Sequence, residues 1–305
     1  MAEPSNVPPV GEIRAPGMDH ALYPFRKLAD APRMEWRMGA RIAFTVTLMV
    51  DYWELQPPAD ASPDPRMGSP LGKFDPDWLT WSQREYGNRV GIYRVLDMLD
   101  RFGVIPTVAL GSAAAKRYPE LVYDLKQRYA GFMAHGTHAT RRITNAMDDM
   151  DEMIMLAECM DAIGAAAGEP PIGWCGQDYA QSERTPDMLA QAGFKYVTDW
   201  SNDDRPYRIG SEGLISLPAQ SEWSDIECMW HRNVLPQTWA DGVVEAFDVL
   251  YAEGGACFNL TLNPWLTGQA HRIRYLGDIL ARTLGRKGVW KARMDEVFYT
   301  VEGQV

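Results

Sequence analysis

Cysteine and histidine are both scarce in this chain, and each scarcity narrows the chemistry that it can carry. Its four cysteines, Cys159, Cys175, Cys228 and Cys257, are scattered through 305 residues with no CxxC pair. That spacing argues against a disulfide framework or a zinc finger, so we expect reduced thiols in the core. Because the chain has only five histidines, any imidazole chemistry must use a short list of positions.

Long apolar runs and an excess of positive charge are missing as well. No apolar stretch reaches the ~18–20 residues that span a membrane, and the N-terminal residues lack the basic and apolar regions of an export signal. A net charge of −11 disfavours nucleic acid and anionic membranes as partners. We therefore expect a cytoplasmic protein that acts on a neutral or small polar molecule.

Apolar runs of strand length alternate with amphipathic segments of helix length. The run from Arg41 to Val50 is almost entirely apolar or β-branched, which is typical of a strand buried on both faces of a parallel sheet. Further strands are predicted at 105–110, 132–134, 172–175, 195–199, 215–217 and 256–262. Helices are predicted at 88–102, 119–130, 147–168, 185–193 and 271–285, and a long loop at 56–83.

This alternation predicts an α/β fold, a distorted (β/α) barrel of about seven strands in a single domain. The barrel would take residues 39–305. Residues 1–38 are rich in proline and show little hydrophobic periodicity, so we expect them to form an extended N-terminal arm lying on the body.

Polar and aromatic side chains follow several of the predicted strands at the point where each strand ends. In a barrel these ends open on one face, where functional groups collect. Two histidines stand only three positions apart after the third strand, with Gly136 between them to allow a tight turn. The strand-end residues are Asp51 and Glu54, His135 and His138, Asp199 and Trp200, and Asn263 and Trp265.

A carboxylate and imidazoles that converge on this face allow two mechanisms. Glu54, His135 and His138 could hold one divalent metal, most simply Zn²⁺, because carboxylate and imidazole are ligands that it accepts. Alternatively, Glu54 and His135 could act without a metal as an acid–base pair in a dry, tryptophan-rich pocket. The sequence leaves both open, and Asp51 could equally be a turn-capping residue.

Six stretches of the chain stand in a characteristic order. They are Val50–Glu54, Arg84–Gly91, Ala134–Gly136, Pro171–Gly176, Trp200–Tyr207 and Leu262–Ile273. Taken together, they resemble the polysaccharide deacetylase (NodB-homology) superfamily, and within it the allantoinase and cyclic-imide hydrolase branch. The resemblance covers roughly residues 35–285. It implies a distorted (β/α) barrel, hydrolysis of a C–N bond in an amide, imide or ureide, and assembly as a homo-oligomer, a dimer or tetramer.

The chain departs from the deacetylase pattern at its chemical positions. Trp53 falls where the deacetylases place their catalytic base, and Glu54 falls where they place a metal-binding Asp. The HxxxH metal motif is present only as His135, because Ala139 takes its fourth following position and His138 comes one residue early. These departures disfavour ordinary sugar deacetylation.

Two later motifs differ in the same way. The turn that carries an arginine in the deacetylases reads Gly173–Gly176 here, and the late Leu-His pair reads Leu262–Asn263, with His271 nearby. The tryptophans would wall the pocket, and Arg89 or Arg205 would orient a substrate carbonyl or carboxylate. The predicted substrate-binding residues are Asp51, Trp53, Tyr86, Arg89, Trp174, Trp200, Asn263, Trp265 and His271.

The favoured hypothesis is a hydrolase of non-peptide C–N bonds in a small molecule, with water activated by Glu54 or His135. One alternative is a lyase or isomerase that uses the same pair to shuttle a proton. A non-catalytic binding protein and a carbohydrate N-deacetylase are the remaining hypotheses.

Overall fold

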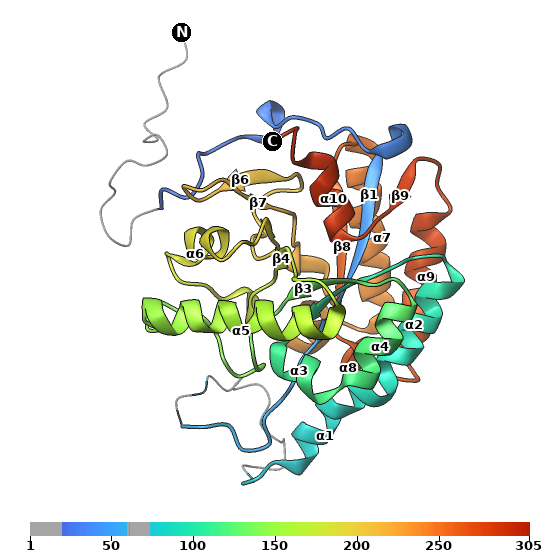
Figure 1. Ribbon diagram of the computed structural model, residues 1–305. Helices are drawn as coiled ribbons and strands as arrows, with labels where there is room; N and C mark the ends of the chain where they lie inside the picture. Colours follow the sequence, from blue (N-terminus) through green and yellow to red (C-terminus); the bar gives the residue numbers. More distant parts are fainter. Residues whose placement is uncertain (1–19, 60, 62–73) are drawn as a thin grey trace.

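A single curled sheet forms the centre of the computed structural model, which describes residues 20–59, 61 and 74–305. Helices cover the outside of the sheet (Figure 1). The strands are β1 (Ile42–Val50), β2 (Thr107–Leu110), β3 (Gly131–Ala134), β4 (Gly173–Trp174), β5 (Tyr196–Val197), β6 (Tyr207–Ile209), β7 (Leu214–Ser216), β8 (Cys257–Leu262) and β9 (Val289–Lys291).

The helices alternate with these strands along the chain. The α-helices are α1 (Trp78–Tyr86), α2 (Ile92–Arg101), α3 (Ser112–Arg117), α4 (Pro119–Gln127), α5 (Asp149–Ala167), α6 (Thr185–Gln191), α7 (Pro236–Glu253), α8 (Pro264–Thr267), α9 (Ile273–Leu284) and α10 (Met294–Val301). Short 3₁₀ turns are η1 (Leu28–Asp30), η2 (Arg37–Gly39), η5 (Gln177–Tyr179) and η6 (Ser221–Trp223), and π-helical turns are η4 (Gly87–Gly91) and η7 (Ile226–His231).

The strand order in the sheet is β6-β7-β5-β4-β3-β2-β1-β8, with β9 paired to the start of β1. Every neighbouring pair is parallel except β6 and β7. The curled sheet is that of a distorted (β/α) half-barrel, so the predicted fold class is confirmed. Over the described residues the sheet has nine strands, whereas the sequence predicted about seven. The two additional strands, β6 and β9, are short and carry no long apolar run, so the hydrophobic pattern did not reveal them.

Strand β1 is the axis of the sheet because it pairs with three neighbours. Its residues lie opposite β2, β8 and β9 in parallel register, as in the pair Thr47 and Thr107. The apolar side chains of β1 are buried on both faces, as the sequence predicted. Thr45 and Thr47 donate to the side-chain oxygen of Asn259 on β8, at 3.1 and 3.0 Å, so these three buried polar side chains are hydrogen-bonded to one another.

The helix before residue 102 is longer than predicted. Helices α1, η4 and α2 run on continuously, so the predicted loop at 56–83 is wrong for its last residues. Asp77 caps the new start, because its carboxylate accepts the backbone N–H of Thr80 at 3.0 Å. Residues 60 and 62–73 of that predicted loop lie outside the described residues.

The described part of the N-terminal arm lies against the body. Met34 and Trp36 are buried, and the Trp36 ring centroid lies 6.0 Å from that of Trp290. Farther back, the carbonyl of Leu22 accepts the N–H of Gly210 at 2.9 Å, just beyond the edge strand β6. The division into an arm at 1–38 and a barrel at 39–305 stays a prediction.

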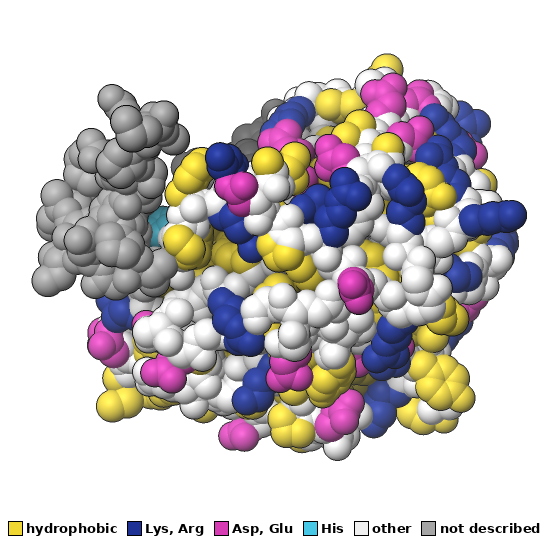
Figure 2. All heavy atoms as spheres, turned by 90° about the horizontal axis from the view of Figure 1, so that it is seen from above, with side chains coloured by type: hydrophobic (Ala, Val, Ile, Leu, Met, Phe, Trp, Pro, Cys, Tyr) yellow, Lys and Arg dark blue, Asp and Glu magenta, His cyan; other side chains and the backbone are white. Residues whose placement is uncertain are grey.

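The structure also gives information on membrane-spanning helices, on surface charge and on the state of the cysteines. Over the described ranges, no helix combines the length and apolarity needed to cross a bilayer. Acidic and basic side chains are interspersed on the face near the amino ends of the strands (Figure 2). All four cysteines are free, and Cys159, Cys175 and Cys257 are buried as predicted for core thiols.

Close backbone packing places α8 beside the helical turn η4. A Cβ added at Gly91 would lie 2.1 Å from the carbonyl oxygen of Pro264, and one at Gly87 would lie 2.7 Å from the backbone nitrogen of Trp265. Only glycine permits this approach. The contact fixes the segment that follows β8, and that segment carries Asn263 and Trp265.

We predict that Gly91→Ala lowers the free energy of unfolding by about 1–3 kcal/mol, because the new methyl group would overpack this contact. The matched control is Gly242→Ala in α7, where an added Cβ meets nothing within 4 Å. That control should raise stability by about 0.5–1 kcal/mol through helix propensity. Urea unfolding of both variants measures the difference, and equal effects would contradict backbone contact at Gly91.

Candidate active site

A small cavity opens at the carboxyl ends of the strands. Its volume is about 40 Å³, and five of the predicted site residues line it. They come from three separate strand ends, as expected for a barrel of this kind. These five are Asp51, Trp53, His135, Asn263 and Trp265, and the remaining lining residues are Met49, Ala139, Gln177, Asp178, Tyr179 and Ile226.

His135 follows β3 directly and is held by the backbone. Its Nδ1 lies 2.6 Å from the carbonyl oxygen of Cys175, so Nδ1 carries a hydrogen and donates it. The residue is 2% exposed, and Gly136 turns the chain away with a φ of 61°. This arrangement leaves Nε2 as the ring nitrogen available for chemistry.

Asp51 is the carboxylate that faces this nitrogen. Its Oδ1 lies 3.4 Å from Nε2 of His135 and accepts a hydrogen bond from Nε2 of Gln177 at 2.8 Å. Burial raises the pKa of Asp51 above its usual range, although the charge of His135 and the bond from Gln177 oppose the shift. The two groups form a buried acid–base pair.

The loop that holds Gln177 has unusual backbone geometry. Asp178 and Tyr179 have φ values of 51° and 58°, a region that residues other than glycine rarely adopt. Asp178 is anchored by an ion pair with Arg142 at 2.6 Å. Strained backbone of this kind persists where the surroundings enforce it, often at functional sites.

Asp199 supports the same loop from behind. Its carboxylate accepts the N–H of Gly176 at 2.7 Å, and Gly176 directly precedes Gln177. Burial raises the pKa of Asp199 to about 7, despite the hydrogen bond from Gly176. Asp199 is therefore tied to the site through the backbone and not by contact with the cavity, which it does not line.

Glu54 is engaged elsewhere. Its carboxylate accepts a hydrogen bond from Thr140 at 2.5 Å and pairs with Arg141 at 3.3 Å. Burial raises its pKa, but the bonds from Thr140 and Arg141 outweigh burial and hold the pKa of Glu54 below its usual range. The structure thus brings Asp51, and not Glu54, to His135.

The residues present do not fit the predicted metal site of Glu54, His135 and His138. The ring of His138 packs edge-on against Tyr52 with centroids 5.7 Å apart, and it does not line the cavity. Within the described ranges, no three His, Cys, Asp or Glu side chains are grouped so that they could hold a metal ion. The mechanism proposed below therefore uses no metal ion.

A buried arginine packs against the two tryptophan rings that line the cavity. The guanidinium of Arg84 lies 3.4 Å from the ring centroid of Trp265, and 5.3 and 5.2 Å from those of Trp53 and Trp230. Arg84 is 2% exposed. Its charge helps to oppose the rise in the pKa of Asp51 and favours negative charge in the site.

The other predicted binding residues do not join this cavity. Trp174 is buried against Phe194, Trp200 packs on Tyr23 of the arm, and the hydroxyl of Tyr86 accepts a hydrogen bond from Arg94. Arg89 is exposed on the helical turn η4, and His271 is exposed in the turn before α9. Arg205 donates to the carbonyl of Ala31 in the arm at 2.6 Å.

Sequence reasoning missed Gln177, Arg84 and Asp225. Gln177 stands two positions beyond the predicted strand at 172–175, so the strand-end rule could have found it. Arg84 lies inside a stretch already noted for its resemblance, where Arg89 and Tyr86 were chosen instead. Asp225 follows no strand, and no local signal marks the hydrogen bonds that its carboxylate accepts from the backbone N–H and the side-chain amide of Asn263.

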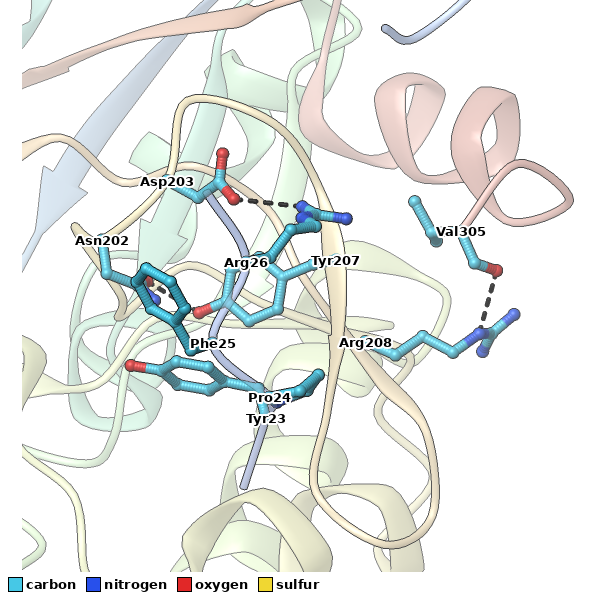
Figure 3. A pocket seen from close by; sticks show the side chains of 9 residues that line it. All are labelled: Tyr23, Pro24, Phe25, Arg26, Asn202, Asp203, Tyr207, Arg208 and Val305. Carbon is cyan, nitrogen blue, oxygen red and sulfur yellow. Dashed lines mark hydrogen bonds and ion pairs between the residues drawn. The ribbon is translucent and has the colours of Figure 1, made fainter. Parts of the chain in front are cut away.

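A larger cavity of about 470 Å³ lies along the β6 edge, between the arm and the C-terminus. Figure 3 shows that its polar groups pair with one another. Arg26 bonds to Asp203 at 3.0 Å, and Tyr207 donates to Asn202 at 2.7 Å. Arg208 donates to the carbonyl of Val305 at 3.0 Å. The acid–base pair is in the smaller cavity, so we place the candidate active site there.

Comparisons with known proteins agree with this architecture. No protein-family model matches the chain. A Schizosaccharomyces pombe protein named "Putative polysaccharide deacetylase" is 28% identical over 243 residues, which are 70% of this chain and 73% of that protein. The predicted resemblance to the polysaccharide deacetylase superfamily is thereby confirmed in sequence.

Solved structures show the same fold. The "probable Polysaccharide deacetylase" from Pseudomonas aeruginosa PAO1 superposes with a TM-score of 0.79 at 23% identity, covering 92% of this chain and 99% of that one. A structure titled "Puue Allantoinase" gives a TM-score of 0.79 at 22% identity, covering 90% of this chain and 95% of that one. The fold is therefore shared with both the deacetylases and the allantoinase.

We predict that stability falls as the pH rises from about 4 to about 7, in part because of Asp199. Its pKa rises from 3.8 to about 7 on folding, so the folded state keeps a proton that the unfolded chain loses across this window. Urea unfolding at pH 5, 6, 7 and 8 measures the slope. Asp199→Asn, which can still accept from Gly176, should lose less stability over this range than the wild type; parallel curves would contradict the assignment.

Proposed function

We propose that this protein hydrolyses a non-peptide C–N bond, in a linear or cyclic amide, imide or ureide of a small molecule. The observation that carries the proposal is the buried pair of Asp51 and His135 at the strand ends, 3.4 Å apart. The names of the similar proteins, deacetylase and allantoinase, are those of enzymes that cleave C–N bonds, and they support the same reaction class.

Asp51 acts as the general base in this mechanism. Its raised pKa makes the carboxylate a better proton acceptor than an ordinary aspartate. As water attacks the substrate carbonyl carbon, one proton of the water moves to Asp51. The new C–O bond leaves negative charge on the former carbonyl oxygen, and the buried charge of Arg84, which packs on the cavity-lining ring of Trp265, favours that charge electrostatically.

His135 acts as the general acid. With Nδ1 committed to the carbonyl of Cys175, only Nε2 can exchange a proton with substrate. The protonated Nε2 donates to the leaving nitrogen as the C–N bond breaks. Asp51 then returns a proton to Nε2 across their contact, which restores the starting state without another reactant.

A small, flat substrate suits the walls of the site. Trp53 and Trp265 line the cavity together with the acid–base pair, and aromatic rings bind planar groups by stacking.

A cytoplasmic location and a homo-oligomeric assembly stay predictions. So does the alternative of a lyase or isomerase, which would use the same proton shuttle without adding water.

We expect Asp51→Asn and His135→Ala each to lower kcat/KM by about 10²–10⁴-fold, because each removes one proton-transfer group. Glu54→Gln is the matched control, since Glu54 does not line the cavity, and it should change kcat/KM less than tenfold. Steady-state kinetics on hydantoin, succinimide, allantoin and acetamide supplies the measurement. A larger loss in Glu54→Gln than in Asp51→Asn would restore Glu54 as the base.

Reaction in H₂¹⁸O separates hydrolysis from the lyase or isomerase alternative. Hydrolysis places one labelled oxygen in the carboxyl product, which mass spectrometry detects. A product without label would support the alternative, and no turnover of any compound in the screen would overturn the proposed function.

The acidic limb of the rate profile should report on Asp51. Because the base must be ionised and its pKa is raised, kcat/KM should fall with decreasing pH at values above the usual aspartate range of about 4. Gln177→Ala removes a hydrogen bond that lowers this pKa, so the limb should move to higher pH. A limb that stays in place or moves downward would contradict Asp51 as the base.

A further inference from the structure

The side-chain amide of Asn263 has one possible orientation at the cavity. Its Nδ2 donates to Oδ1 of Asp225 at 3.0 Å, and its backbone N–H donates to Oδ2 at 2.8 Å. A carboxylate only accepts hydrogen bonds, so the amide nitrogen must face Asp225. The amide oxygen therefore points away from Asp225.

Asp225 is itself built into the core. It is 0% exposed, and Thr267 donates to it at 2.6 Å in addition to the two bonds from Asn263. A buried carboxylate with this many donors is a rigid anchor. The anchor holds the Asn263 amide through a side chain that does not itself line the cavity.

The Oδ1 of Asn263 is left open toward the site. No residue in the described ranges donates a hydrogen bond to it, and it is not among the atoms shut off from solvent. Asn263 is 6% exposed and lines the cavity. The oxygen's accessible surface therefore faces the cavity.

Gln177 presents a second oxygen of the same kind. Its Nε2 donates to Oδ1 of Asp51 at 2.8 Å and to the carbonyl of His135 at 2.6 Å, which uses both amide protons. Among the described side chains and backbone groups, none donates to its Oε1. Two fixed acceptors thus stand beside the acid–base pair.

We propose that Asn263 determines specificity by accepting a hydrogen bond from an N–H of the substrate, with Gln177 as a second acceptor. This rests on the proposed function and narrows its substrate class to amides, imides or ureides that keep an N–H beside the scissile carbonyl. An oxygen acceptor that meets an N-methyl group is left without a hydrogen-bond partner in the bound complex. That loss costs much more binding than the added volume alone.

The test compares succinimide with N-methylsuccinimide, and hydantoin with its N-methyl derivatives. Wild-type protein should prefer the N–H compound by at least about tenfold in kcat/KM. In Asn263→Ala the preference should shrink about tenfold or more, through loss of rate on the N–H compound alone. The ratio cancels the fraction of active protein, and comparing the ratio between the variant and the wild type also cancels the intrinsic reactivity of each compound.

Thr267→Val is the matched control, because it removes a donor to Asp225 but leaves both bonds from Asn263. Its preference ratio should equal that of the wild type. A ratio that is unchanged in Asn263→Ala, or reduced equally in Thr267→Val, overturns the assignment. If Asn263→Ala does not fold, equal inhibition of the wild type by the N–H and N-methyl compounds overturns it instead.

These outcomes are distinct from failure of the proposed function. If the N–H and N-methyl compounds are turned over at equal rates, the role proposed for Asn263 is contradicted, but the proposed hydrolase function is not. Absence of turnover for every compound in the screen contradicts the proposed function itself.

Discussion

The hydrogen bond between Nδ1 of His135 and the carbonyl of Cys175, at 2.6 Å, organises the rest of the site. It joins the end of β3 to the end of β4 and determines which ring nitrogen is available. Because Nε2 is then directed at Asp51 from β1, one contact relates three strand ends. The curled sheet makes this possible by bringing the carboxyl ends of parallel strands onto one face.

Around this contact, each polar group is held by a second residue. Asp199 fixes Gly176, Gln177 fixes Asp51, and Asp225 fixes Asn263, so each functional group has its orientation set before a substrate arrives. Burial disfavours the charged form of the carboxylates in this arrangement, and it raises the pKa of Asp51, Asp199 and Asp225. Such preorganisation is what a site needs to stabilise a developing charge.

The contacts in the site show what two residues that differ from the deacetylase pattern, Asn263 and Glu54, do in this structure. Asn263 stands where a deacetylase-like pattern would have histidine, and asparagine cannot donate a proton as an acid. Its amide is instead oriented by Asp225 and offers an acceptor. Glu54, next to the position of the missing base, forms an ion pair with Arg141 and supports the loop after β1. Both residues lie near the strand ends, and both are held by contacts to other side chains.

The sequence by itself determined the fold class, most of the strands, the helices α2, α4, α5, α6 and α9, and the five predicted site residues that line the cavity, but it missed the long helix α7. It could determine the strands and the site residues because buried parallel strands are continuous apolar runs and because such strands end on a common face. Tertiary structure alone decided that His135 faces Asp51 and not Glu54, and that Asn263 is oriented by Asp225. These choices depend on side-chain directions and on contacts between residues far apart in the chain, which local patterns do not encode.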